Sequence, residues 1–243
     1  MEMQNRYAEG QEFLVSRAPD WAPDNGLAFH NWWHLALFHL EQEDYVAALK
    51  LYDDDEIDAS ESDISQELVD ASALLWRITL GGHDVGDRWQ KTAAAWASKV
   101  GVEGGYYAFN DLHAIMAFVG ADKLDEARAV LAALTVAVTD NPGVTGIMAQ
   151  AVGVPACSAM IAFAEQRYDD AVDNLYPIRL IAHRFGGSHA QRDVLTQTLI
   201  ESAIRAGQLS LASNLLHERS IHKPTSPLTV RFKQKLISAS QSA

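Results

Sequence analysis

The spacing of apolar side chains constrains the fold most, because they recur at steps of three and four residues along almost the whole chain. This period places them on one face of an α-helix, and no stretch sustains the alternation of a β-strand. Turn-forming sequences interrupt the pattern at APDNG (22–26), GGHDVGD (81–87), GVEGG (101–105), NPG (141–143), GG (186–187) and KPTSP (223–227). The sequence therefore predicts an all-α protein of helices joined by short turns.

Four segments align with one another as copies of a helical hairpin. Each copy has an aromatic residue or a leucine in the turn and an alanine three positions later: Tyr45 and Ala48, Leu124 and Ala127, Tyr168 and Ala171, Leu209 and Ala212. A small residue is needed where the second helix presses close to the first. The pattern resembles the tetratricopeptide repeat of about 34 residues. It predicts a right-handed α-α superhelix, with extra helices such as the pair at 63–99 interleaved.

The N-terminal residues 3–14 match only the second helix of a copy, with Tyr7 at the aromatic and Gly10 at the small position. A helical repeat cannot cover its apolar face alone, so we expect this end to present an unsatisfied packing surface. Two interpretations stay open: the end docks on a partner chain or a second copy, or the chain is the C-terminal part of a longer protein. Residues 1–243 are expected to form a single helical-repeat domain that begins within an incomplete first repeat.

Four stretches, HNWWHLALFHLE, ALKLYD, FNDLHAIMAF and GGSHAQRD, resemble the tetratricopeptide repeat protein 38 family in their order and spacing. The likeness extends over essentially the whole chain, and GGSHAQRD is its most specific part. Family members are roughly twice this length, so the chain resembles their C-terminal half. The resemblance implies a cytosolic helical-repeat protein and no catalytic activity that can be transferred to it.

Composition excludes several classes of partner. The formal net charge of −13 argues against nucleic acid, which needs clustered Lys and Arg. The acidic runs at 53–58 and 61–63 are interpreted as a solvated loop. We expect no membrane span and no secretion signal, hence a cytoplasmic protein. The single Cys157 excludes an internal disulfide framework and is expected to be inert.

The first helix of each repeat lines the concave face in this architecture, and counting back from the alanines locates its positions. The predicted ligand-binding groove consists of His30, Trp33, His34, Leu37, Phe109, Asn110, His113, Met116, Cys157, Met160 and Gln197. Trp32 and His39 are expected in the hairpin core, and His34 is expected to stack on His113. This mixed surface suits a protein segment or an apolar small molecule, which predicts a non-enzymatic binding protein. Replacing Trp33 and His113 by alanine is expected to abolish ligand capture and leave helicity unchanged.

Metal binding is the alternative prediction. His30 and His34 lie four residues apart, on one helix face, and Asp111 or His113 of the next copy would complete a ligand set for a divalent metal in a metal-dependent enzyme. The HExxH glutamate of a protease is absent. The competing interpretation is that these histidines only satisfy one another and nearby polar groups by hydrogen bonds. We therefore favour no cofactor.

The stretch GGSHAQRD also has two interpretations. Arg192, with His189 beside it, would contact an anion at a helix N-terminus. Alternatively, Ser188 and Gln191 form a capping box, and Asp193 pairs with Arg192 or with a neighbouring helix. We favour the structural interpretation, because capping accounts for two of these residues.

Overall fold

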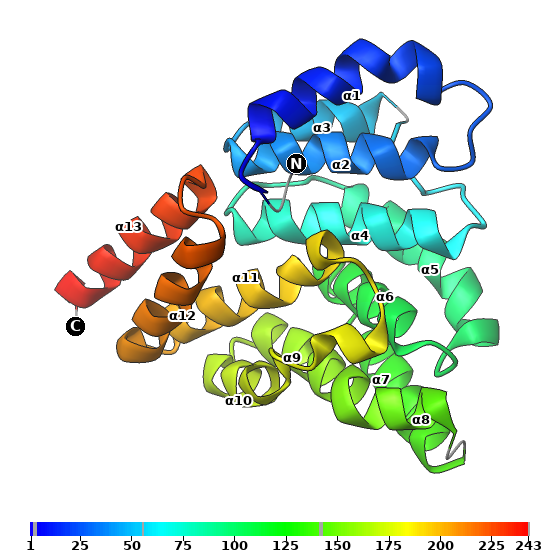
Figure 1. Cartoon of the computed structure of the whole chain (residues 1–243). Helices are drawn as coiled ribbons and strands as arrows, with labels where there is room; N and C mark the ends of the chain where they lie inside the picture. The colour runs from blue at the N-terminus through cyan, green and yellow to red at the C-terminus, as the bar shows by residue number, and fades with distance from the viewer. Residues whose placement is uncertain (2–3, 55, 141–142, 243) are drawn as a thin grey trace.

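The computed structural model describes residues 1, 4–54, 56–140 and 143–242 (Figure 1). All regular structure in these ranges is helical, so the all-α prediction is confirmed. Asp55 of the predicted acidic run, and Asn141 and Pro142 of the predicted NPG turn, lie outside the described residues, as do Glu2, Met3 and Ala243.

Successive helices of the described chain form five antiparallel pairs. They are α2 (Ala28–Glu41) with α3 (Tyr45–Asp53), α4 (Ser65–Leu80) with α5 (Arg88–Glu103), α6 (Ala108–Gly120) with α7 (Leu124–Asp140), α9 (Val154–Ala164) with α10 (Tyr168–Ile178), and α11 (His189–Arg205) with α12 (Leu209–His222). Helix α1 (Tyr7–Trp21) precedes them and α13 (Pro227–Ser242) follows. Helix α8 (Val144–Met148) and a π-helical turn (Ala149–Gly153) lead into α9, and a 3₁₀ turn (Ala182–Phe185) precedes α11.

The four aligned copies share one turn geometry. Each has a residue in the left-handed region two positions before the turn aromatic or leucine: Glu43, Asp122, Gln166 and Gly207, with φ of 62°, 58°, 60° and 71°. The next N–H donates to a carbonyl five residues back: Asp44 to His39, Lys123 to Phe118, Arg167 to Ala162 and Gln208 to Ala203. This is the Schellman ending of a helix. The predicted alanines Ala48, Ala127, Ala171 and Ala212 are all 0% exposed, so each lies where its pair of helices is in closest contact.

The pair α4 and α5 corresponds to the extra helix pair expected at 63–99, but the alignment did not identify it as a copy of the hairpin. Helix α4 ends in the same way, with Gly82 at φ 83° and the His83 N–H donating to the Ile78 carbonyl, 3.2 Å. The connection to α5 is longer than in the other pairs, which shifts the register. Trp89 and Thr92 of α5 are buried, at the spacing that the other copies give to their aromatic residue and alanine. Helix α4 packs on α2 and on α6.

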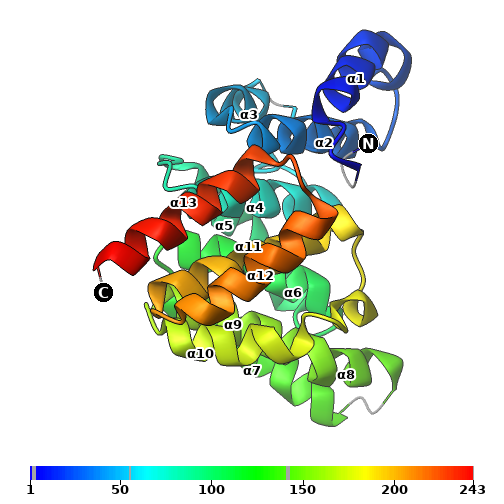
Figure 2. The same ribbon diagram turned by 60° about the vertical axis from the view of Figure 1, so that its left-hand side comes forward.

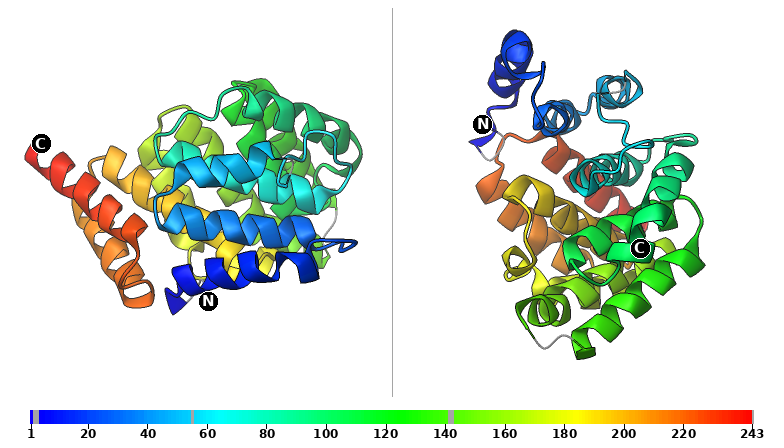
Figure 3. Two further views of the ribbon diagram at one scale, coloured as in Figure 1. Left: turned by 90° about the horizontal axis from the view of Figure 1, so that it is seen from above. Right: turned by 90° about the vertical axis from the view of Figure 1, so that its right-hand side faces the viewer.

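Helix α1 packs on α2 at the N-terminal end, and Gly10 allows the close approach. A Cβ at Gly10 would lie 2.4 Å from the ring of Phe38. On other sides of α1, the apolar side chains of Phe13 and Val15 are about half exposed. Figure 3 shows α1, α2 and α3 lying side by side when the molecule is seen from above.

The helical stretch Val144–Ala164 has 21 residues and, by length and composition alone, is apolar and long enough to cross a membrane. The sequence was expected to contain no membrane span, and this stretch, which has no charged side chain, nevertheless has the length and composition of one. Half of its most apolar 18-residue window is buried inside the fold.

The last helices turn back over the earlier ones. Helix α11 packs on α10 and also on α4, and α13 reaches α2. Figure 2 shows α12 and α13 lying across this side of the molecule, with α11 behind them. The chain therefore brings its C-terminal hairpin onto its first and second hairpins.

Candidate functional site

The first helices α2, α4 and α6 present one side toward α11 and the segment before it. We call this side the inner face and define it by Trp33 and Leu37 of α2, Asp70 and Arg77 of α4, and Phe109 of α6. Arg77 lies at its centre, with its guanidinium 5.7 Å from the centre of the Trp33 ring. Arg77 also donates to the carbonyl oxygens of Ala190 (2.8 Å) and Gln191 (3.2 Å) in the first turn of α11.

Most of the predicted groove residues are buried rather than open to a ligand. Trp33, His113, Met116, Cys157 and Met160 are 0% exposed, Leu37, Phe109 and Gln197 are also buried, and His30, His34 and Asn110 are half-buried. That alanine at Trp33 and His113 abolishes ligand capture and leaves helicity unchanged stays a prediction, but these two positions do not separate ligand capture from stability. Both side chains belong to the core, and their removal would create cavities.

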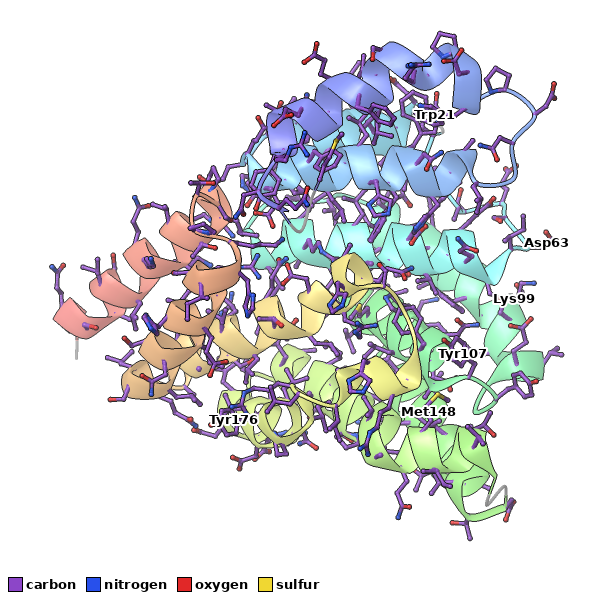
Figure 4. The ribbon with its side chains drawn as sticks, in the orientation of Figure 1. Trp21, Asp63, Lys99, Tyr107, Met148 and Tyr176 are labelled. Carbon is purple, nitrogen blue, oxygen red and sulfur yellow. The ribbon has the colours of Figure 1, made fainter. Side chains whose placement is uncertain are left out.

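The two tryptophans point in different directions, as predicted, but with the exposures exchanged. Trp32 is half-buried and packs edge-on against Trp21 of α1, with 4.7 Å between ring centres. Trp33 lies on the inner face beneath Arg77 and is fully buried. Figure 4 labels Trp21 on α1, above α2. His39 is half-buried and lies against Gln11 of α1, at 3.3 Å.

The expected register between the histidines of α2 and α6 is also wrong. Helix α4, the first helix of the α4–α5 hairpin, packs on both α2 and α6 and therefore lies between them. His34 packs instead against Trp33 and His30, with 5.0 and 4.7 Å between ring centres. His113 donates through Nδ1–H to the Phe109 carbonyl oxygen, 2.7 Å away, and packs on the Phe109 ring.

A short segment before α11 covers the part of the inner face that α6 contributes. We call residues 181–188 the covering segment. Phe185 is fully buried and meets Phe109 edge to face, with 5.3 Å between ring centres. Gly186 has a φ of 99°, and a Cβ on it would lie 1.9 Å from the Tyr107 hydroxyl. Gly187 has a φ of 72°, and a Cβ on it would lie 2.6 Å from the Phe109 ring. Figure 4 labels Tyr107 beside the loop that leads into α11.

The residues of GGSHAQRD have structural contacts at the start of α11. The predicted capping box is present, since Ser188 accepts from the Gln191 N–H and the Gln191 side chain accepts from the Ser188 N–H. Arg192 donates through Nη1 to the carbonyl oxygens of Gly186 (3.1 Å) and Gly187. The guanidinium thus holds the covering segment, and His189 beside it is exposed. Asp193 pairs with Arg219 of α12, which is the neighbouring-helix alternative.

His30 forms a contact that the sequence did not indicate. Its Nδ1 lies 2.6 Å from Oδ2 of Asp70 on α4, and Asp70 is fully buried. Gln191 donates to the other Asp70 oxygen at 3.3 Å. The hydrogen bond to Asp70 raises the pKa of His30, whose side chain is 22% exposed. Burial lowers the pKa of the adjacent His34 to about 4, so His34 is neutral at pH 7.

The four metal candidates do not form one site. Within the described ranges, no group of three or more His, Cys, Asp or Glu side chains is arranged to hold a metal ion. His30 is paired with Asp70, and His113 is on α6, which α4 separates from α2. Asp111 accepts from the Gly105 N–H at 3.0 Å, and its charge raises the pKa of the buried Cys157 thiol further than burial alone does.

Asp111 gives a pH-dependent prediction, because burial raises the pKa of its carboxyl from 3.8 to about 6. A raised carboxyl pKa destabilises the folded state once the pH exceeds the unfolded value, and the penalty is complete above about pH 6.5. The free-energy difference between Asp111→Asn and the parent chain should therefore shift in favour of the variant by about 2 kcal/mol from pH 4.5 to 7.5. Urea unfolding at both pH values measures it.

The parent chain and the Asp111→Asn variant contain the same histidines. The effect of histidine protonation on the free energy of unfolding therefore cancels in the difference between them. Asp63→Asn, at an exposed side chain, is the matched control. A difference for Asp111→Asn that stays constant over this pH range would show that the buried carboxylate is not penalised.

A buried ionic cluster joins the C-terminal hairpin to the first. We define it as Glu41 of α2, Asp193 of α11, Arg219 of α12 and Lys223, which directly follows α12. Glu41 Oε1 accepts from Lys223 Nζ (2.5 Å) and Arg219 Nη2 (3.4 Å), and Asp193 accepts from both Nη atoms of Arg219 (2.6 and 3.1 Å). The side chains of Arg219 and Lys223 are each 3% exposed.

In this cluster, the attraction between opposite charges counteracts the cost of burying them. Burial opposes ionisation of Asp193, yet the charges of Arg219 and Lys223 hold the pKa of this carboxyl well below its usual value. The cluster borders a cavity of about 20 Å³, which Arg77 and Gln197 also line. That volume holds about one water molecule, so the cavity is too small for an organic ligand.

Sequence reasoning missed several residues of these sites, among them Glu41, Asp70, Arg77, Phe185, Arg219 and Lys223. A signal was available for two of them, because Asp70 and Arg77 are the charged residues within the otherwise apolar run LVDASALLWRITL. A charge at such a position is buried only when it has partners. Arg77 donates to carbonyl oxygens of α11 more than a hundred residues away, and Asp70 pairs with His30, 40 residues away, which no local pattern reveals.

No protein-family model matches the chain, and no solved structure matches it.

Proposed function

We propose that this chain is a tetratricopeptide-like helical-repeat binding protein, similar to the tetratricopeptide repeat protein 38 family, whose inner face holds a protein segment. The observation that carries the proposal is the repeated hairpin: four copies with the same left-handed turn residue and a fully buried alanine. In a right-handed superhelix built from such hairpins, the first helices line the concave face. The inner face is formed by first helices too, which supports assigning the binding surface to it.

A protein segment suits the inner face better than an apolar small molecule. The surface of α2 and α6 is aromatic, with Trp33, Phe109 and the neutral His34 and His113. The volume in front of it is already filled by backbone and side chains of the covering segment, and the cavity nearby has about 20 Å³. A ligand of polypeptide shape therefore matches the dimensions of the space.

The test uses peptides selected from a random library on the purified chain. We expect selected peptides to bind His34→Ala at least tenfold more weakly, because His34 lies at the half-buried edge of the inner face. His217→Ala is the matched control, since it removes an exposed imidazole from α12. Peptides that bind both variants as tightly as the parent chain would contradict recognition at the inner face.

The His30–Asp70 contact favours a second candidate function, a hydrolase in which His30 activates water. Asp70 accepts the Nδ1 proton, so the Nε2 lone pair is available as a general base, and the imidazole is partly exposed. Chromogenic ester and phosphodiester substrates test this candidate. Turnover that is lost in His30→Ala and retained in His217→Ala would support it, and equal turnover by both variants would remove it.

A further inference from the structure

We propose that the covering segment is an intramolecular occupant of the peptide site, and that the partner peptide displaces it by placing an aromatic side chain where Phe185 lies. This inference rests on the proposed function and names the class of partner: a peptide with one aromatic residue followed by two small residues.

The aromatic requirement follows from the surroundings of Phe185. Its ring is fully buried and stands edge to face on Phe109, with an interplanar angle of 76°. Tyr107 and His113 flank Phe109, with 6.0 and 4.6 Å between ring centres. Edge-to-face contacts of this kind favour an aromatic side chain over an aliphatic one of equal area.

The small-residue requirement follows from Gly186 and Gly187. Their backbone lies directly on Tyr107 and Phe109, at distances where a Cβ would overlap both side chains. A peptide that follows the same path must therefore carry glycine, or a residue nearly as small, at the two positions after its aromatic residue.

The covering segment is attached in a way that allows displacement. Its backbone N–H groups bond locally, from Ile181 to Ile178, from Arg184 to Ile181 and from Gly186 to His183. Its contacts with α6 come from the Phe185 ring and the two glycines. His183 and Arg184, on the other side of the 3₁₀ turn, are exposed. Arg192 of α11 also donates to the carbonyl oxygens of Gly186 and Gly187. A peptide that follows the same path offers Arg192 the same two carbonyl oxygens, so its aromatic side chain and its backbone together replace those of the covering segment.

The experiment uses a fluorescently labelled peptide with the chain's own residues 179–192, RLIAHRFGGSHAQR, and a matched peptide with the phenylalanine replaced by alanine. Fluorescence anisotropy measures binding of both peptides to the parent chain and to Phe185→Ala. In the parent chain the tethered segment competes at a high effective concentration. We expect Phe185→Ala to bind the phenylalanine peptide at least tenfold more tightly than the parent chain does, and the alanine peptide at least tenfold more weakly than the phenylalanine peptide.

A folded Phe185→Ala chain that binds neither peptide, or both equally, would overturn the proposal. Circular dichroism establishes folding, and Phe185→Leu, which retains most of the buried volume, decides the question by the same criteria where the alanine variant unfolds. If library peptides bind in a His34-dependent way while the phenylalanine peptide fails on both variants, the inner face is a binding site and the covering segment is not its occupant. If neither kind of peptide binds, the proposed function fails as well.

Discussion

Replacing Glu41 by glutamine is expected to lower the free energy of unfolding by about 3–5 kcal/mol, because it leaves two buried cations short of a charge. Glu41 accepts hydrogen bonds from Lys223, Arg219 and Ser226, and both cations are almost fully buried. Glutamine keeps the shape and one acceptor oxygen, so the loss reports the charge rather than the packing. Urea denaturation followed by circular dichroism measures it.

The matched control is Asp20→Asn, which removes a carboxylate from an exposed pair. Arg17 and Asp20 have side chains 63% and 66% exposed, and such pairs contribute little to stability. If Glu41→Gln were no more destabilising than Asp20→Asn, the ionic cluster would not hold the C-terminal hairpin on α2.

Replacing Gly187 by alanine is the second change with a large expected effect, about 2–4 kcal/mol of destabilisation. Alanine is strained at a φ of 72°, and its Cβ would meet the Phe109 ring at 2.6 Å. The ring cannot move aside, because Tyr107, His113 and Phe185 pack around it.

Gly207→Ala separates the two contributions. Gly207 has nearly the same φ, 71°, and a Cβ there would meet nothing within 4 Å. This control should therefore show the backbone strain alone, about 1–2 kcal/mol. Equal destabilisation by the two substitutions would mean that the covering segment does not lie on Phe109 in solution.

The hairpins were predictable from sequence because their determinants are local. The aromatic residue or leucine, the alanine three positions later and the turn lie within a few residues of one another. A residue in the left-handed region also recurs at the same turn position in all four copies. The pair α4 and α5 was not recognised as an equivalent copy, because its longer connection moves Trp89 and Thr92 out of register. Because this pair was left out of the aligned copies, α2 was expected beside α6, which produced the incorrect contact between His34 and His113.

The direction of side chains on the first helices was also partly predictable. Trp33 and Phe109 face the inner side, as the 100° step between helical neighbours indicates. That step says nothing about what lies opposite, so the sequence predicted an open groove where the structure has Phe185 and α11. The pairings of Glu41 with Arg219 and of Asp70 with His30 join segments that only the complete fold brings together.

The central claim is that the chain's own segment occupies the inner face, and the contact between Phe109 and Phe185 tests it most directly. Nuclear Overhauser spectra of protein labelled at phenylalanine, with Phe185→Leu used for assignment, report ring protons at this separation. We predict a cross-peak between the two rings, whose centres lie 5.3 Å apart. Absence of that cross-peak, with the Phe185 ring signals sensitive to a soluble relaxation agent, would show an open inner face and contradict the account.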